Sequence, residues 1–501
     1  MRKNLLAAIV LLVLYIPSVW AAAGYPVRGR VIDRLSREPV AYAAVTITGQ
    51  PGKGAMTDSL GRFEILQVKP GIYSLTASFI GYRTVVTPEY QVSARTPFIE
   101  IEMEEEPEHL NEVVVRPSPF RRTIESPVSM QVIGMREIEK SPGSNRDVSR
   151  IVRSYPGVSF SPIGYRNDLI VRGGGPSENR FFMDGIEIPN INHFATQGAT
   201  GGPVSIVNSD LVREINFYTG SFPADRAGAL SSVLDFRLRD GDLERQTFKA
   251  TLGASEVSLS GSGHVGKKTT YLFSVRQSYL QFLFKLLGLP FLPNYIDGQL
   301  KVKTRFSERD ELTFLGLVGI DNMKLNLDEK GEENEYLLSY LPRIQQETFT
   351  VGAVYRHYAG RHVQSVALSH NYLNNRNTKY RNNDESTPDN LTLRLRGVEQ
   401  KTTLRFENRS YLGRWTLREG AELNYSTYHN KTLQRTYQQE AELLDYRTYL
   451  GIVGWGFFVG ADYASADKRF RWGCGPTDAT IRRKWSVSGS SFRPVCRLLM
   501  P

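Results

Sequence analysis

The sequence is poor in the residues that most simple functional sites require. It has only two cysteines, Cys474 and Cys496, among 501 residues, so no disulfide framework holds it together. It contains neither the Gly-Lys-Ser/Thr of a P-loop nor the His-Glu-x-x-His of a zinc protease, and its seven histidines are dispersed without recognisable ligand spacing. We therefore expect no enzyme, no catalytic residue, no cofactor and no metal site.

Long hydrophobic runs are missing beyond the N-terminus. Residues 1–23 combine a basic start, an apolar run from Leu5 to Ile16, and Ala21 and Ala23 at the spacing of a cleavage site. Nowhere else do about 18 apolar residues follow one another, so no transmembrane helix is expected. We interpret residues 1–23 as a secretory signal peptide and expect the mature chain to leave the cytoplasm.

The positive charge is not concentrated as in a nucleic-acid-binding protein. The formal net charge is +10, but the charges are scattered through strand-like segments, whereas a nucleic-acid surface gathers them in a stripe. We therefore expect no nucleic-acid partner. The 25 Tyr, 24 Phe and 43 Gly residues favour strands and turns, so the fold class is expected to be mostly β.

Residues 24–105 have the pattern of a small β-sandwich. The runs VRGRVID, AAVTITG, GRFEIL and IYSLTASF are predicted strands, and turn residues separate them. The segment resembles the carboxypeptidase regulatory-like domain, a transthyretin-like β-sandwich, and this resemblance implies no peptidase activity. The matching positions are Gly29, Asp33, Pro39, Asp58, Gly61, Phe63, Gly71, Tyr73, Gly81 and Tyr82.

Residues 106–123 are a linker that contains one short apolar strand. Pro117 and Pro119 prevent this strand from continuing into a sheet of its own. Two interpretations stay open: an edge strand of the preceding sandwich, or a segment offered for β-strand addition to a partner's sheet. The four strand residues are Glu112, Val113, Val114 and Val115.

Residues 124–240 read as a compact α/β unit. VSMQVIG, LVREINFYTG and LSSVLDFRLR are predicted strands, and residues 144–155 are a predicted helix with Ser144 and Asp147 at capping-box spacing. Between them, LIVRGGGPSENRFFMDGIEI places three glycines after a strand. A phosphate cradle needs a helix that begins at the glycines, but here more strand follows, which argues against a nucleotide site.

The same stretch resembles the plug of TonB-dependent outer-membrane receptors, in the order strand, (I/V)RG, short loop, strand and DG turn. YPGV at residues 155–158 and the segment that contains LVREINFYTG agree with this resemblance. EVVV at residues 112–115 matches the TonB box as it occurs in Bacteroidetes-type receptors, after the regulatory-like domain. The plug-motif residues are Arg172, Gly173, Gly174, Gly175, Asp184 and Gly185.

Each plug-motif residue then has an expected role. The resemblance implies that Arg172 faces carboxylates on the inner wall of the barrel, which suits its forked donors; a solvated Arg172 is the alternative. The three glycines would permit positive φ and close backbone approach. Asp184 and Gly185 would form the turn of a hairpin between two plug strands.

Residues 241–470 alternate apolar and polar side chains in long segments. In QLKVKTRF, for example, Leu300 and Val302 take one face, while Lys301 and Lys303 take the other. Strands of about ten residues with one apolar and one polar face fit a transmembrane β-barrel. A water-soluble antiparallel sheet with one dry face is the alternative for any single strand. For the apolar stretch 280–293, a loop helix or strand extension is favoured over a membrane-surface helix.

The predicted barrel is too short to enclose the predicted plug. The residues after Asp240 supply roughly ten strands, whereas plugged transporters have about 22. From about Arg471 the alternation stops and basic residues accumulate, so residues 471–501 are interpreted as an aberrant tail produced by a frame change; a genuine loop of unusual composition is the alternative. We therefore expect three parts: a β-sandwich, an α/β plug and an incomplete antiparallel transmembrane β-barrel.

The resemblance implies a TonB-dependent receptor in the outer membrane of a Gram-negative cell, with a periplasmic N-terminal domain. Its expected partners are TonB of the inner-membrane energy-transducing complex, outer-membrane lipid, an unknown solute and a surface lipoprotein. Iron chelates, oligosaccharides, cobalamin and peptides all stay open as the solute. The alternatives are a surface binding or adhesion protein and a vestigial fragment that transports nothing.

Overall fold

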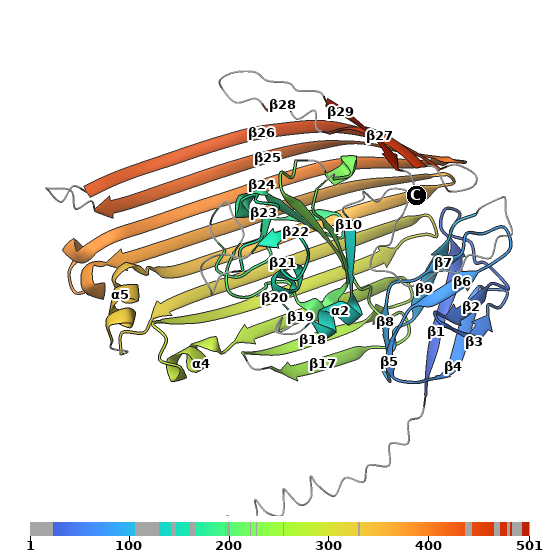
Figure 1. Cartoon of the computed structure of the whole chain (residues 1–501), viewed down its shortest axis with the longest axis horizontal. Helices are drawn as coiled ribbons and strands as arrows, with labels where there is room; N and C mark the ends of the chain where they lie inside the picture. Colours follow the sequence, from blue (N-terminus) through green and yellow to red (C-terminus); the bar gives the residue numbers. More distant parts are fainter. Residues whose placement is uncertain are drawn as a thin grey trace, which may run out of the picture.

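The computed structural model describes most of the chain after the predicted signal peptide. The described residues are 24–105, 130–141, 147–159, 167–195, 197, 201–220, 222–226, 228–253, 255–328, 331–435, 443–464, 471–477, 481–482 and 493–499. They form a sandwich, a plug and a long curved sheet, which we call the wall (Figure 1). No helix among them is long and apolar enough to cross a membrane.

The sandwich (residues 24–105) contains the predicted strands. One sheet has the order β4-β1-β9, with β1 parallel to β9, and the other has the order β3-β2-β6-β7. Fully buried side chains such as Val31, Val45 and Ile101 form a core of its own. Its strands are β1 (Tyr25–Asp33), β2 (Ala44–Ile47), β3 (Gln50–Met56), β4 (Arg62–Val68), β5 (Gly71–Tyr73), β6 (Leu75–Ser78), β7 (Val85–Val86), β8 (Tyr90–Val92) and β9 (Ile99–Met103).

The plug (residues 130–240) is built on a five-stranded sheet with the order β10-β15-β16-β13-β14. The predicted helix is shorter than expected: α3 begins at Val148, where the Asp147 side chain caps it by accepting a hydrogen bond from Ser149 N, and it ends at Val152. Its elements are β10 (Met130–Gly134), α2 (Met135–Lys140), α3 (Val148–Val152), β11 (Val158–Ser159), β12 (Ile170–Val171), η1 (Pro176–Glu178), β13 (Asn179–Met183), β14 (Ile186–Ile188), η2 (Ser209–Leu211), β15 (Val212–Tyr218), η3 (Ala224–Arg226) and β16 (Ser232–Leu238).

The wall is one antiparallel sheet of thirteen strands in which nearly every strand pairs with its sequence neighbours. Its strands are β17 (Thr247–Leu252), β18 (Glu256–Val265), β19 (Thr269–Ser278), β20 (Phe291–Arg305), β21 (Asp310–Leu325), β22 (Arg343–Ala359), β23 (His362–Tyr380), β24 (Leu391–Leu412), β25 (Trp415–Arg435), β26 (Leu443–Ala464), β27 (Arg471–Thr477), β28 (Ile481–Arg482) and β29 (Arg493–Leu499). Within the described residues the sheet is open, with β17 at one edge and β29 at the other.

Two sequence expectations for the wall need correction. Strands β20 to β26 have 15 to 22 residues, not about ten, because their hydrogen-bonded pairing continues along nearly the whole length of each neighbouring strand. Strand structure also continues past Arg471, where β27 pairs with β26 and β29. The aberrant origin of residues 471–501 stays a prediction.

The two ends of the wall differ in their connections. At one end the links between strands β18 and β25 are two to four residues long: 266–268, 306–309, 360–361 and 413–414. At the other end, most links are longer, and two of them carry the helices α4 (Leu280–Leu286) and α5 (Glu332–Tyr340). We call these the short-turn end and the long-loop end. The helix α4 agrees with the expected loop helix, and the sandwich lies at the short-turn end (Figure 1).

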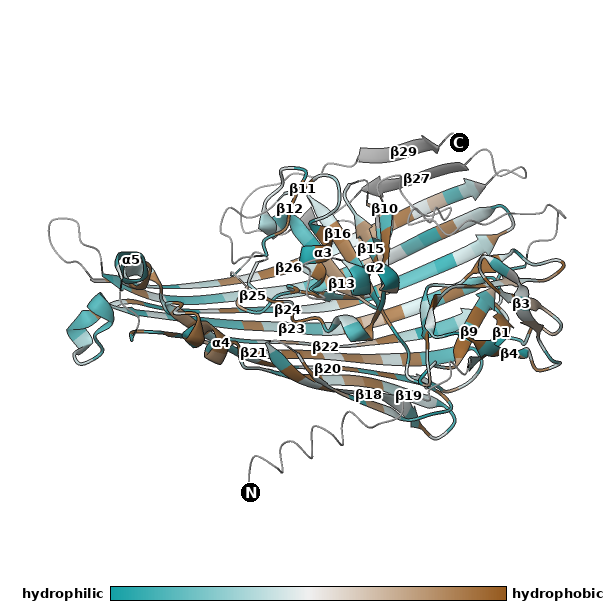
Figure 2. Cartoon of the chain, turned by 60° about the horizontal axis from the view of Figure 1, so that its bottom comes forward, coloured by the Kyte–Doolittle hydropathy of each residue, from teal (hydrophilic) through white to brown (hydrophobic). Residues whose placement is uncertain are grey.

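The wall buries polar side chains and exposes apolar ones, the reverse of a water-soluble sheet. On β20, Asp297, Gln299 and Lys301 are buried, whereas Ile296 and Leu300 are exposed. Figure 2 shows the same alternation of hydrophobic and hydrophilic residues along neighbouring strands. The plug lies in the hollow of the wall (Figures 1 and 2). Polar side chains such as Lys301 are buried there against the plug, whereas apolar ones such as Leu300 stay exposed. This pattern is typical of a wall with lipid outside and a wet interior and argues against the soluble-sheet alternative.

Candidate functional site

The candidate site is the contact of the plug with the wall, and it begins at the predicted plug motif. Arg172 follows β12 with φ of 51°, and its backbone N donates to Gly157 O at 2.7 Å. Its side chain is exposed, and Nη2 donates to Thr219 Oγ1 at 3.2 Å. The contact with wall carboxylates that the resemblance implies stays a prediction.

The glycines after Arg172 have separate local causes. Gly173 has φ of 80°, a left-handed conformation that glycine adopts without strain. A Cβ on Gly174 would lie 2.5 Å from Ser231 Oγ, and this hydroxyl donates to Val171 O at 2.7 Å. The motif therefore makes one turn and one close approach between packed plug segments.

Asp184 and Gly185 form the two-residue turn between β13 and β14. Their φ angles, 48° and 94°, are both positive, as a type I′ hairpin turn requires. The Asp184 carboxylate accepts from Leu238 N at 3.2 Å and lies 2.9 Å from Lys301 Nζ on the wall. The turn thus also forms an ion pair with the wall, a role that the sequence did not indicate.

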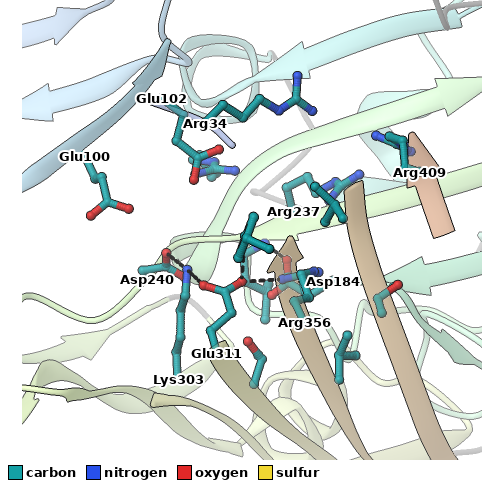
Figure 3. A pocket seen from close by; sticks show the side chains of 18 of the residues that line it. Arg34, Glu100, Glu102, Asp184, Arg237, Asp240, Lys303, Glu311, Arg356 and Arg409 are labelled. Atoms are coloured by element: carbon teal, nitrogen blue, oxygen red, sulfur yellow. Dashed lines mark hydrogen bonds and ion pairs between the residues drawn. The ribbon is translucent and has the colours of Figure 1, made fainter. Parts of the chain in front are cut away.

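Lys301 is part of a chain of alternating charges at the short-turn end, and Figure 3 shows its neighbours Asp240, Lys303 and Glu311. Asp240 pairs with two lysines of the wall, Lys301 at 2.7 Å and Lys303 at 3.2 Å. Lys303 also pairs with Glu311 of the wall at 3.3 Å. That glutamate also pairs with a wall arginine at 3.0 Å. The members are Asp184, Asp240, Lys301, Lys303, Glu311 and Arg356.

A second charged contact involves the 3₁₀ turn η3 of the plug. Asp225 lies 3.5 Å from Arg418 of β25, and its backbone carbonyl accepts from Arg405 of β24. Arg226 pairs with Asp235 at 3.2 Å inside the plug. Burial alone would raise the pKa of Asp225, but the surrounding arginines outweigh burial and lower it.

A third contact joins Glu187 of β14 to the wall. Its carboxylate pairs with Arg180 of the plug at 2.7 Å and with Lys401 of β24 at 2.6 Å. Burial opposes the charged form, yet these two cations lower the pKa of Glu187. The carboxylate is therefore ionised, and it pairs with one cation of the plug and one cation of the wall.

A fourth contact lies nearer the long-loop end and is built on His193, a fully buried residue of a plug loop. Its Nδ1 lies 2.6 Å from Asp321 and its Nε2 lies 3.1 Å from Asp297, both on wall strands. The ring stacks on Tyr295 with centroids 4.0 Å apart. Burial opposes protonation, but the two carboxylates outweigh it and raise the pKa of His193 to about 9.

These four contacts make the plug an insert held largely by polar groups. Apolar contacts contribute too, because Leu315 and Val354 of the wall belong to the same core cluster as Ile215 of the plug. Ion pairs and hydrogen bonds can be exchanged for water one at a time, whereas a continuous apolar core cannot. The interface thus combines four charged contacts with an apolar cluster that plug and wall share.

The structure does not bring all the predicted site residues together in one site. Arg172 and Asp184 belong to different contacts, with Thr219 and Lys301 respectively. The predicted TonB-box residues, 112–115, and the predicted signal peptide lie outside the described residues. Within the described ranges, no group of three or more His, Cys, Asp or Glu side chains is arranged to hold a metal ion.

The wall contacts were missed by sequence reasoning, although a signal existed. Lys301, Lys303 and Arg305 alternate on the polar face of one predicted strand. Three cations that face the interior of a barrel need anions there, and Asp184, Asp240 and Glu100 supply them. The partners themselves could not be chosen, since each lies far away in the sequence.

Comparisons with known proteins agree with the two N-terminal parts. The CarboxypepD_reg-like domain family matches residues 27–115, and the TonB-dependent Receptor Plug Domain family matches residues 122–231. The chain thus carries a regulatory-like domain followed by a TonB-dependent receptor plug, packed against an antiparallel wall. The first match includes residues 112–115, so the edge-strand alternative for EVVV stays open.

Individual relatives point to the same class. The TonB-dependent transporter Oar of Myxococcus xanthus is 25% identical over 227 residues, which are 43% of this chain and 20% of Oar. The ferripyoverdine receptor of the Pseudomonas aeruginosa outer membrane has a similar fold, with a TM-score of 0.53 at 14% identity over 82% of this chain. The copper transporter OprC has a TM-score of 0.52 at 13% identity over 74% of the chain.

The chain matches only part of these relatives. The matched regions cover 62% of the ferripyoverdine receptor and 61% of OprC. The chain therefore spans less than two thirds of the length of the proteins it resembles. Their architecture is shared, while the Bacteroidetes type expected from the sequence stays a prediction.

Proposed function

We propose that this protein is an outer-membrane receptor for TonB-driven uptake of a scarce solute. The observation that carries the proposal is the plug: a domain of the TonB-dependent receptor family, matched over residues 122–231, occupies the hollow of an antiparallel wall. Polar residues of the wall face this plug, and apolar residues face outward. Such a wall belongs in lipid, and an exported chain meets that lipid in the outer membrane.

The orientation follows from the ends of the wall. Outer-membrane barrels have short periplasmic turns and longer extracellular loops. The sandwich lies at the short-turn end and is therefore assigned to the periplasm, where residues 106–123 would also be accessible to TonB. In this proposal TonB pairs with Glu112 to Val115 and pulls on the plug, and the polar contacts between plug and wall break.

A binding experiment with the purified periplasmic domain of TonB tests the proposal. Val114→Pro removes a backbone donor from the paired strand and should weaken binding by about tenfold or more. Val114→Thr keeps the donor and the branched side chain, so it should bind like the parent. Equal binding of Val114→Pro and the parent would show that this segment is not the TonB box.

One observation favours a second candidate function. The wall of the described residues is open between β17 and β29, so it does not surround the plug. A protein of this shape could hold a solute or a surface partner without passing anything across the membrane. TonB binding together with solute uptake supports the receptor, whereas solute binding that is independent of TonB supports the binding protein.

A further inference from the structure

The sandwich contacts the short-turn end of the wall through three cations. Arg305, the last residue of β20, forms a double ion pair with Glu100 of β9, and its Nη1 lies 2.7 Å from Oε2. In the opposite direction, the Arg37 guanidinium of the sandwich lies 4.7 Å from the ring centre of Tyr358 on β22. Arg34 stands 5.2 Å from the ring of Tyr411 on β24 in the same way.

These contacts touch alternate strands of the wall near the same end. β20, β22 and β24 all run toward short turns, at residues 306–309, 360–361 and 413–414. The sandwich therefore spans the rim across five neighbouring strands, β20 to β24, and does not hang from one loop. The Arg136 side chain of the plug also pairs with Glu89 of the sandwich at 3.3 Å, and Arg245, just before β17, donates to Ala94 O at 3.3 Å. Together with the three wall contacts, these fix the place of the sandwich over the plug.

The contact is built so that it can open. Glu100 also pairs inside the sandwich with Arg30 at 2.7 Å and with Arg37 at 3.1 Å. If Arg305 moved away, the carboxylate would keep these two partners and would not become an unpaired buried charge. Arg305 is already partly exposed, with 21% of its side chain accessible, and would gain water at the strand end.

A partly open cavity lies behind the contact. A cavity of about 460 Å³ is lined by all three parts of the protein. Arg34 and Glu102 come from the sandwich, Asp184 and Arg237 from the plug, and Arg356 from the wall (Figure 3). The charged chain around Lys303 forms one side of this space.

We propose that the face of the sandwich formed by β1, β9 and the turn between Asp33 and Glu38 is an interaction surface for the rim of this chain's own wall. The sandwich is a detachable lid over the cavity beneath the plug. The role of the lid rests on the proposed function: in a receptor, a solute would reach the periplasm only after the plug shifts and the sandwich detaches.

Cysteine labelling of the cavity tests the lid without any transport. Ser365 of β23 lines the cavity, and Ser365→Cys is a small change there. In the full chain, with Cys474 and Cys496 replaced by serine, we would measure its reaction with a bulky polyethylene-glycol maleimide. Ser339→Cys on the exposed face of α5 reports the rate for an open position.

The lid predicts slow labelling of Ser365→Cys in the parent and labelling about tenfold or more faster when Arg305→Glu is added, because the open fraction sets the rate. Arg305→Lys keeps the charge and should stay slow. Tyr358→Ala with Tyr411→Ala should also speed the reaction, from the other two contact points. High salt should act in the same direction.

Two results would overturn the lid: labelling of Ser365→Cys as fast as that of Ser339→Cys in the parent, or labelling that none of the rim changes alters. The TonB-binding experiment is separate. Slow labelling of Ser365→Cys in a protein that does not bind TonB refutes the receptor and keeps the lid. TonB binding together with labelling as fast as that of Ser339→Cys refutes the lid alone.

Discussion

Gly173, Gly174 and Gly175 follow one another in the plug motif, yet each tolerates a side chain differently. Gly173 has a positive φ and nothing within 4 Å of an added Cβ, Gly174 has a close contact with Ser231, and Gly175 has an ordinary φ of −70°. The sequence shows three equal letters, and the backbone gives them three separate roles. A motif of this kind can be found by resemblance, but its cause can only be seen in the packed plug.

The three glycines allow a matched series of alanine variants. Gly174→Ala should destabilise the plug by about 1–3 kcal/mol, because the new Cβ would overlap Ser231. Gly173→Ala should cost roughly 1–2 kcal/mol through its positive φ. Gly175→Ala should be nearly neutral. Urea unfolding of the three variants measures the order, and a Gly175→Ala protein as unstable as Gly174→Ala would contradict this explanation.

His193 gives the plug–wall contact a pH dependence. Its pKa is raised to about 9, so its contribution is fully present below the ordinary value near 6.5 and is lost as the pH rises through about 9. The groups that face it are Asp297, Asp321 and Tyr295, with Arg276 bonded to Asp297 at 3.0 Å.

We expect the parent protein to lose on the order of 3 kcal/mol more stability between pH 6.5 and pH 10 than His193→Asn, which cannot titrate. Urea midpoints of both proteins at both pH values measure this difference, and the titration of all other groups cancels in the comparison. Equal losses in the two proteins would mean that the imidazolium does not hold the plug loop to the wall.

At the scale of elements, the apolar outward face of the wall strands predicts that the wall inserts into lipid. Ile320 of β21 is 52% exposed on the outward face. Ile320→Arg should reduce insertion into phospholipid vesicles by up to about 2–4 kcal/mol, the cost of an arginine at mid-depth. Glu308→Arg, in the exposed short turn after β20, adds the same side chain and should insert like the parent. Equal insertion of both variants would favour a wall that faces water.

The elements also show what a single sequence can and cannot predict. Alternation along QLKVKTRF predicted the two faces of β20, because the period of two belongs to any strand. Strand length was wrong, since nothing local marks where a strand leaves the bilayer. The predicted helix was too long, because α3 spans only Val148–Val152. Its cap, Asp147, also accepts from Ser205 N at 2.9 Å, a tertiary contact that no local pattern reveals.

For the whole molecule, the domain order was accessible from the sequence, whereas the docking was not. His193 and Asp321 are 128 residues apart, and Glu100 and Arg305 are 205 apart. A local pattern can show that a strand has a charged face but cannot choose its partner over such a distance. The candidate site therefore had to be found from the structure, although its ingredients were visible as alternating lysines and arginines.

The docking of the sandwich should resist acid more than an ordinary ion pair does. Burial opposes ionisation of Glu100, but Arg305, Arg30 and Arg37 outweigh it and lower the pKa to about 2. A lowered pKa means that the stabilisation is present above the ordinary value near 4.5 and is lost as the pH falls through about 2.

The distance between spin labels at Ser59→Cys in the sandwich and Ser339→Cys in α5, in the chain with Cys474 and Cys496 replaced by serine, should thus be the same at pH 7 and pH 3.5. Arg305→Gln should broaden the distance distribution at both pH values, because the wall no longer contributes a charge. If the parent separates between pH 7 and pH 3.5, an ordinary surface carboxylate holds the domains together, and Glu100 is not the centre of the contact.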